Sequence, residues 1–193
     1  MELKGKHVGL AVTGSFCTFA KIEQEIRHLK ETGAILHPVF SGSVQSTDSR
    51  FGDTGQFMDR ITSIAEMKPI LKIEEAEPIG PKGYLDILLI APCTGNTLAK
   101  LAHGISDTPV TLGAKSMLRS GRPVVIALST NDGLAASFSN LAALTNRKHY
   151  YMVPFAQDDY LKKPSSLQSD FCLIRDTLEC ALRGRQLGPV LNV

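Results

Sequence analysis

Residues 87–102 read Ile-Leu-Leu-Ile-Ala-Pro-Cys-Thr-Gly-Asn-Thr-Leu-Ala-Lys-Leu-Ala. The unbroken apolar run at the start, Ile87–Ile90, is typical of a strand buried on both faces of a parallel sheet. Apolar residues then recur at helical spacing, at Leu98, Leu101 and Ala102. The polar turn between them contains Asn96 and Thr97, either of which can cap the helix. A strand, a tight polar loop and a helix N-terminus in this order form the place where an open α/β sheet binds ligands.

The same alternation of strand and helix continues on both sides of this stretch. Apolar runs typical of buried strands lie at 7–12, 35–40, 123–128 and 150–154. Helical spacing covers about 18–32, 54–67, 110–120, 134–145 and 170–184, and Thr54 is the expected cap of the second of these helices. Loops are expected at 41–49, at 68–83 with a short strand at 70–73, and at 157–169. This pattern predicts a three-layer, doubly wound parallel sheet of the Rossmann-like or flavodoxin-like α/β class.

Length and charge limit the organisation and the partners. The chain has 193 residues, 43% of them hydrophobic, and a formal net charge of +2. We expect a single domain, with residues 1–155 as its main part and a C-terminal loop and helix at 156–193 packed on it. The balanced charge gives no reason to expect nucleic acid or an anionic membrane as a partner. The apolar runs are also far shorter than the ~20 residues that span a bilayer.

Cysteine usage and the N-terminus favour a cytoplasmic protein. The four cysteines, at 17, 93, 172 and 180, show no C-x-x-C spacing. This favours free thiols in a reducing compartment over disulfides or a zinc site. Cys172 and Cys180 are expected on one face of the last helix, in the core. The first residues lack the hydrophobic region of a signal peptide.

Small and polar residues follow three of the expected strands. After the first strand, the turn Thr13-Gly14-Ser15 lets backbone N–H groups and a hydroxyl approach a phosphate, although such turns also occur as plain connections. Ser41 and Ser43 begin a serine-rich segment that would hydrogen-bond a phosphate or ribityl chain, or form a solvated loop. Asn131 follows the strand at 123–128. We therefore expect a ligand site at the carboxyl ends of these strands.

These motifs resemble the flavoprotein family that includes FMN-dependent cysteine decarboxylases and flavin prenyltransferases. The resemblance covers about residues 5–155 and is most specific at 91–107. There the family reads Ala-Pro-Ala-Ser-Ala-Asn-Thr, followed by a helix and an Ala-Asn-Gly-Ile-Ala-Asp turn. The resemblance implies FMN as cofactor. Its phosphate would lie at Gly14, Ser15, Ser41 and Ser43, and its ring along Cys93, Thr94, Asn96, Thr97 and Asn131.

Features outside the shared motifs, at 40–45, 50–53 and 157–159, resemble a branch of the family that works as one subunit of a two-subunit synthase. This resemblance implies a homo-oligomer built from trimers, a small dicarboxylate substrate and a partner subunit. Since Thr13-Gly14-Ser15 is not a Gly-x-Gly-x-x-Gly fingerprint, we expect NAD(P)H on the partner subunit. The alternatives are a non-catalytic partner that supports assembly, or a stand-alone decarboxylase or flavin prenyltransferase.

Two departures from the family pattern leave the catalytic residue unidentified. Decarboxylases carry a histidine between the second and third conserved strands, whereas the histidines here are at 7, 28, 37, 103 and 149. Of the family's Pro-x-Met-Asn stretch only Asn131 remains. His103 stands in place of a family asparagine at a helix end, where we interpret it as a helix C-terminal cation or a surface residue.

Three further features each have two interpretations. Cys93 is either an activated thiol at a helix N-terminus or a residue that fills the space of the family's small residue. Asn96 either offers a donor and an acceptor to a ligand or only caps the helix. Lys162 and Lys163 either belong to a lid over a dianionic substrate or to a solvated loop.

Overall fold

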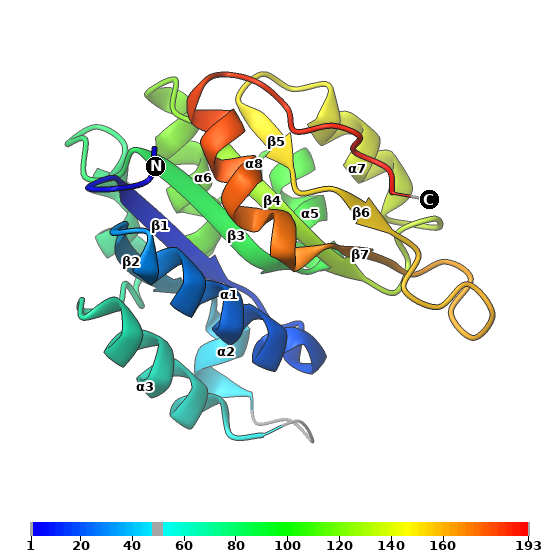
Figure 1. The fold of residues 1–193 in the computed structure, drawn as a ribbon, viewed down its shortest axis with the longest axis horizontal. Helices are drawn as coiled ribbons and strands as arrows, with labels where there is room; N and C mark the ends of the chain where they lie inside the picture. The colour runs from blue at the N-terminus through cyan, green and yellow to red at the C-terminus, as the bar shows by residue number, and fades with distance from the viewer. Residues whose placement is uncertain (1, 48–51, 193) are drawn as a thin grey trace.

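Five parallel strands form the centre of a mixed, seven-stranded sheet in the computed structural model, which describes residues 2–47 and 52–192 (Figure 1). In spatial order they are β2 (Ile35–Phe40), β1 (His7–Val12), β3 (Ile87–Cys93), β4 (Val124–Thr130) and β5 (Tyr150–Met152). The order 2-1-3-4-5 is flavodoxin-like, and its direction reverses between β1 and β3. The predicted α/β, doubly wound fold is confirmed.

Two short strands make the sheet mixed instead of purely parallel. β6 (Phe155–Ala156) and β7 (Leu167–Ser169) pair antiparallel with each other, and β7 also pairs antiparallel with the end of β4. β5 lies beside the first half of β4 and β7 beside the second half. The prediction of an irregular loop as far as residue 169 is wrong here. Three residues are too few to show the alternation by which a strand is recognised.

Helices cover both faces of the sheet, as Figure 1 shows. One face carries α1 (Phe19–Glu31), α2 (Gly42–Ser46), α3 (Thr54–Ala65) and α8 (Ile174–Leu182). The other carries α4 (Ile73–Ala76), α5 (Gly95–Ala102), α6 (Pro109–Arg119) and α7 (Phe138–Thr145). Short 3-10 turns are η1 (Phe16–Thr18), η2 (Glu77–Ile79) and η3 (Phe171–Leu173). Two separate clusters of buried apolar side chains, one on each face, complete the predicted three layers.

The bounds of β1 and β2 agree with the predicted ranges, but several other elements differ. The serine-rich segment forms the short helix α2 where a loop was expected. In place of a strand at 70–73, only an isolated bridge joins Ile70 to Val39. Helix α7 begins at Phe138, because residues 131–137 form a turn at the end of β4. Residues 48–51, which belong to two of the sequence motifs, lie outside the described residues.

The cap of α3 and the place of one cysteine also differ from expectation. Asp53, not Thr54, is the N-cap, and its carboxylate accepts a hydrogen bond of 3.1 Å from the backbone N–H of Gln56. Cys172 lies in η3 and is exposed, because the periodicity of α8 does not extend to that turn. All four cysteines are free thiols. No helix in the described ranges has the length and apolar character to cross a bilayer.

His7 on β1 and His37 on β2 form a close pair. Nδ1 of His7 lies 2.9 Å from Nε2 of His37, and the two rings stack with their centroids 5.1 Å apart. Burial, and then the neighbouring His7, lower the pKa of His37. The unfolded chain therefore binds a proton at this position more readily than the folded protein does. The free energy of unfolding should then fall as the pH drops below about 6.5, the ordinary histidine value.

Urea unfolding at about pH 8 and about pH 5.5 tests this dependence. The variant His37→Gln keeps a polar side chain but cannot titrate, so it should lose less stability between the two pH values than the wild type. His103→Gln, at an exposed position, serves as the control and should follow the wild type. An equal loss in His37→Gln and in the wild type would contradict the assignment.

Candidate functional site

The loops after β1, β3 and β4 meet at the carboxyl edge of the sheet and enclose a cavity of about 230 Å³ with the hairpin loop between β6 and β7. This is the edge where doubly wound sheets bind ligands, at the reversal of strand order. Its lining is almost entirely polar: Gly14, Ser15, Cys17, Thr94, Gly95, Ser129, Thr130, Asn131, Asp158, Lys163, Ser166 and Gln168. We call this space the edge cavity.

Hydrogen bonds from the end of β1 hold the three loops together. Thr13 is buried, and its hydroxyl donates to the carbonyl oxygen of Pro92 at 2.6 Å and accepts from the N–H of Thr94 at 3.0 Å. The Ser15 and Ser129 hydroxyls lie 2.8 Å apart, which links the first loop to the end of β4. The first loop is thus bonded to the end of β3 through Thr13 and to the end of β4 through Ser15, and these contacts form the cavity wall.

Gly14 leaves open the space between the first loop and α2. A Cβ at this position would lie 3.0 Å from the Ser43 hydroxyl oxygen and 3.3 Å from Cζ of Phe16. The Ser43 hydroxyl therefore faces the glycine, and the Ser41 hydroxyl lies 3.0 Å behind it. Without a side chain, the backbone N–H of Gly14 stays accessible to an anion that the Ser43 hydroxyl can also reach, whereas the Ser15 N–H already donates to the Thr13 carbonyl oxygen at 2.8 Å.

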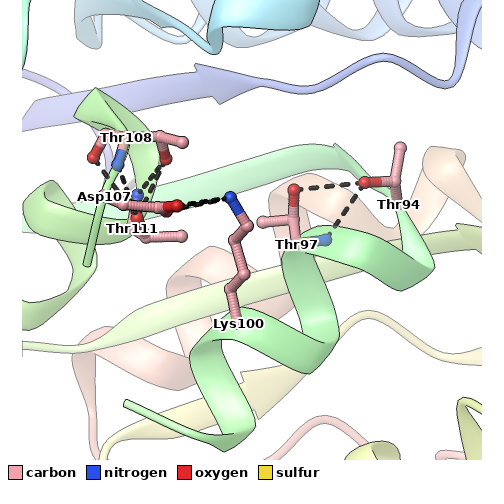
Figure 2. Close-up of polar contacts among 6 residues, drawn as sticks. All are labelled: Thr94, Thr97, Lys100, Asp107, Thr108 and Thr111. Atoms are coloured by element: carbon pink, nitrogen blue, oxygen red, sulfur yellow. Dashed lines mark hydrogen bonds and ion pairs between the residues drawn. The ribbon is translucent and has the colours of Figure 1, made fainter. Parts of the chain in front are cut away.

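Helix α5 begins one turn earlier than the sequence predicts. Thr94, not Asn96 or Thr97, is the N-cap, and its hydroxyl accepts from the N–H of Thr97 at 3.3 Å and donates to the Thr97 hydroxyl at 3.1 Å (Figure 2). Asn96 therefore does not cap the helix, and its side chain is exposed on the first turn of α5.

Figure 2 also shows how the far part of α5 is fixed to the start of α6. Lys100 forms an ion pair of 2.8 Å with Asp107, just before α6. Thr108 caps α6 in a reciprocal arrangement with Thr111. The ion pair therefore connects α5 to the segment that begins α6.

A carboxylate that the sequence analysis did not single out lies beside the edge cavity. Asp132 accepts hydrogen bonds from the hydroxyls of Thr130 and Ser137, the second at 2.8 Å. The hydrogen bond from Thr130, and then that from Ser137, lower the pKa of Asp132 against the opposing effect of burial. A Cβ on Gly95 would lie 2.5 Å from the Thr130 hydroxyl, so α5 packs directly on this group.

The hairpin loop between β6 and β7 brings one lysine and one acid into the edge cavity. Lys163 pairs with Asp158 at 3.0 Å, and this hydrogen bond raises the pKa of Lys163. Burial opposes ionisation of Asp158, but the hydrogen bonds from Ser166 and Lys163 outweigh it and lower its pKa. Lys162 does not line the cavity, and its backbone N–H donates to the Asp159 carboxylate. The structure thus separates two adjacent lysines that the sequence treats alike.

The nine predicted cofactor residues fall into three groups. Gly14, Ser15, Thr94 and Asn131 line the edge cavity. The second group lies next to the cavity without lining it: Ser41 and Ser43 are at its margin near Gly14, and Asn96 is on the adjacent first turn of α5. Thr97 also belongs to this group, but its side chain is buried and hydrogen-bonded to Thr94. Cys93 is the exception, because its side chain is fully buried in the apolar cluster on the α5 face.

Burial decides between the two interpretations of Cys93. It raises the pKa of the Cys93 thiol, which keeps the sulfur protonated and weakly nucleophilic. The Cys93 side chain therefore fills space in the core. His103 lies at the C-cap of α5 with its Nδ1 2.9 Å from the Ala99 carbonyl oxygen, and it is exposed and does not line the edge cavity.

Several lining residues were not predicted. The sequence could have indicated Ser129 and Thr130, because they belong to the polar stretch that follows the apolar run at 123–128. Ser166 and Gln168 had no such signal, because β7 is too short to be recognised from the sequence. Cys17 lies two residues beyond Ser15, with its sulfur 3.9 Å from the Ser15 hydroxyl.

Comparisons with known proteins agree with this geometry. The model of the Flavoprotein family matches residues 1–167. The B subunit of dipicolinate synthase from Bacillus subtilis (strain 168) is 42% identical over 190 residues, which is 98% of this chain and 95% of that protein. The crystal structure of the dipicolinate synthase B subunit from Bacillus halodurans has a TM-score of 0.91 and 41% identity, covering 100% of this chain and 99% of that one.

A more distant structure shows the same fold. The FMN-dependent cysteine decarboxylase SpaF has a TM-score of 0.69 at 22% identity, covering 94% of this chain and 97% of its own. The family match at 1–167 spans all the lining residues of the edge cavity except Gln168. The resemblance carried by the sequence motifs is thereby confirmed. Because a family model covers most of the chain and a relative matches nearly its whole length, this chain belongs to the flavoprotein family.

Proposed function

We propose that this chain binds FMN in the edge cavity and acts as the B subunit of a dipicolinate synthase. With a separate A subunit it would form pyridine-2,6-dicarboxylate from the cyclic lysine-pathway intermediate, in the mother-cell cytoplasm of a sporulating bacterium. The observation that carries the proposal is the meeting of Gly14, Ser15, Thr94 and Asn131 around one polar cavity in a chain 42% identical to the Bacillus subtilis protein.

The residues of the edge cavity fit the phosphate end of FMN. Gly14 leaves its backbone accessible, and the hydroxyls of Ser15, Ser41 and Ser43 supply donors from two loops. The volume of about 230 Å³ lies below the roughly 300 Å³ at which pockets for whole ligands begin. The cavity therefore suits the phosphate and ribityl part, while Asn96 and Asn131 remain for groups of the ring.

The proposed reaction requires loss of water and removal of two electrons. A redox cofactor carries such chemistry, and FMN would supply it when bound. This chain's own part is to orient and bind: Asn96 and Asn131 offer amide donors and acceptors, and Lys163 offers a positive charge to a dicarboxylate. The nicotinamide cofactor is assigned to the A subunit, because this chain lacks a dinucleotide fingerprint. It would act there in its oxidised form, NAD(P)+, which accepts the two electrons and leaves as NAD(P)H.

Apolar side chains around the edge cavity support assembly with other chains. Leu134 and Phe138, on the turn after β4 and the start of α7, are 45% and 54% exposed. Tyr160 and Leu161 in the β6–β7 loop are 67% and 78% exposed. Contiguous exposed apolar surface marks protein contacts, and the backbone N–H of Leu134 donates to the Ser165 carbonyl oxygen at 2.9 Å, which joins the turn after β4 to the β6–β7 loop. We propose a homo-oligomer built from trimers that also binds the A subunit, and size-exclusion chromatography with light scattering tests its mass.

Two measurements test the proposal. The absorbance spectrum of the purified chain, before and after addition of FMN, reports whether flavin binds. Dipicolinate formation by the isolated A subunit, compared with the pair, reports whether this chain takes part in the reaction. Flavin binding with a strong rise in activity supports the proposal. Full activity of the isolated A subunit would favour the assembly role, and decarboxylation of a cysteine peptide by this chain without its partner would favour the decarboxylase alternative.

Asn96→Ala is expected to weaken FMN binding and leave stability nearly unchanged. Its side chain is exposed and the cap belongs to Thr94, so no capping energy is lost. The loss in binding should be roughly 1–3 kcal/mol if a ligand group is left unpaired. Thr94→Ala is the matched variant and should lower the unfolding free energy by about 1 kcal/mol. Flavin titration measures the binding of both variants, and urea unfolding measures their stability. Intact flavin binding in Asn96→Ala would show that Asn96 does not contact the flavin.

Lys163→Gln should raise the KM of the reconstituted synthase for its dicarboxylate substrate about tenfold or more, because a charge-assisted hydrogen bond is lost. Lys162→Gln is the matched control and should leave KM unchanged, since Lys162 does not line the edge cavity. Flavin content should change less than KM in both variants, because the donors that we assign to the FMN phosphate come from the Gly14 turn and from α2. If the two variants behave alike, Lys163 has no special place in substrate binding.

A further inference from the structure

A second cavity lies at the opposite edge of the sheet. It has a volume of about 390 Å³ and is lined by Leu101, Gly104, Ile105, Ser106, Thr111, Lys115, Leu118, Arg119, Arg147 and Tyr150. Tyr150 is the first residue of β5, and Leu101 stands near the end of α5. Both positions lie at the amino edge of the parallel strands. This space, which we call the basal cavity, is therefore separate from the edge cavity.

Three positive charges converge on the basal cavity without an acidic partner among its lining residues. Lys115 and Arg119 stand four residues apart on α6, and Arg147 comes from the turn before β5. Like charges at this helical spacing repel each other. Asp107, on the loop that supplies Ile105 and Ser106, is already paired with Lys100. An anion in the cavity would relieve the repulsion.

Arg147 is held in place before any ligand binds. Its guanidinium donates to the carbonyl oxygens of Leu101 and Ala102 at 3.1 and 2.6 Å, at the C-terminus of α5. Two of its donor groups are thus occupied and the others remain available. A guanidinium fixed in this way loses little side-chain entropy when it binds a carboxylate.

Tyr150 adds a further polar group to the wall of the basal cavity. Its side chain lines the cavity at 8% exposure, and its hydroxyl makes no hydrogen bond to another described residue. The hydroxyl lies near enough to Arg147 to feel its charge, although burial dominates and raises the pKa of Tyr150 to about 12. Leu101, Ile105 and Leu118 supply apolar surface beside these polar groups.

We propose that the basal cavity is a binding site for a small aromatic dicarboxylate. The apolar wall fits a ring, and cations on two separate elements, α6 and the turn before β5, fit two carboxylates. Inorganic phosphate lacks the apolar body and a neutral ring lacks the charge, so each should bind more weakly. The inference does not depend on flavin binding, because the two cavities share no lining residue.

Methyl NMR of the isoleucine-labelled full chain tests the proposal, because Ile105 is the isoleucine that lines the basal cavity. Benzene-1,3-dicarboxylate should shift the Ile105 signal with a Kd of about 1 mM or below. Two control probes each lack one of the two features. Benzene-1,3-dimethanol has the ring but no charge, and inorganic phosphate has the charge but no ring. No shift of Ile105 up to about 10 mM, or an equal shift with either control probe, would overturn the proposal.

Variants locate the binding within the cavity. The double variant Lys115→Gln, Arg119→Gln should weaken binding about tenfold or more, and Tyr150→Phe should weaken it by about threefold. Lys148→Gln is the control, because Lys148 is exposed and does not line the cavity. Arg147 is left unchanged, since its loss would also disturb α5. Unaltered affinity in the double variant, or an equal loss in Lys148→Gln, would count against the site.

Discussion

Replacing Gly14 by leucine is expected to reduce FMN affinity by about a hundredfold or more while the chain stays folded. The added Cβ would already lie 3.0 Å from the Ser43 hydroxyl oxygen, and the rest of the side chain would fill the space that we assign to the phosphate. The backbone N–H of Gly14 could then no longer reach an anion. Gly14 lines the edge cavity, so the added side chain can extend into that space and not into the buried core. We therefore expect the variant to fold.

Flavin fluorescence titration measures the affinity, and urea unfolding confirms that the variant is folded. Gly14→Ala provides the graded control, since its Cβ requires only a small shift of the Ser43 side chain and should weaken binding less. Unchanged flavin affinity in a folded Gly14→Leu protein would place the phosphate elsewhere.

The largest loss of stability is expected from Gly80→Ala. Gly80 follows η2, and an added Cβ would overlap the backbone carbonyl oxygen of Ser116 on α6 and lie 2.5 Å from its carbonyl carbon. The Gly80 N–H also donates to the Ser116 hydroxyl at 3.0 Å, and that hydroxyl donates to the Glu77 carbonyl at 2.7 Å. Backbone atoms cannot rotate away, so the free energy of unfolding should fall by about 3 kcal/mol or more.

Urea unfolding of Gly80→Ala against Gly113→Ala provides the comparison. Gly113 lies within α6 on the same side of the sheet, and its Cβ would meet Ile79 at an ordinary 3.6 Å. That variant should be as stable as the wild type or slightly more stable, by up to about 1 kcal/mol. A loss below about 1 kcal/mol in Gly80→Ala would show that η2 can move away from α6 at little cost.

The candidate site illustrates how far loop sequences can be interpreted. Gly14, Ser15, Thr94 and Asn131 were predicted from small and polar residues at strand ends, and the structure brings all four to one cavity. Position along a strand is enough for this, because parallel strands end at a common edge. Which loop residues face that cavity depends on how the chain turns after each strand. Lys162 and Lys163 show this limit, because they are adjacent in the sequence but only Lys163 lines the edge cavity.

Cys93 shows the same limit within a strand. Simple alternation along β3 would put its side chain on the same face as Leu89 and Ala91. The register of β3 with β4 shifts between Ile90 and Cys93, and the thiol lies instead in the cluster of Leu88 and Ile90. Such an irregularity moves a side chain to the opposite face of the sheet. Pro92, which lies between Ile90 and Cys93, is a local signal for a bulge in a central strand, but it does not tell which face the next side chain takes.

The sequence by itself determined the α/β class, the bounds of β1 and β2, the sheet edge at which the polar loops meet and the family, because buried strands, amphipathic helices and polar turns are local patterns. Only the tertiary structure decided that β7 completes the sheet, that Thr94 starts α5, and that Lys163 reaches the edge cavity. It alone also brought Lys115, Arg119 and Arg147 to the basal cavity. These features depend on contacts between residues far apart in the chain, such as Arg147 with Leu101, and no local pattern encodes them.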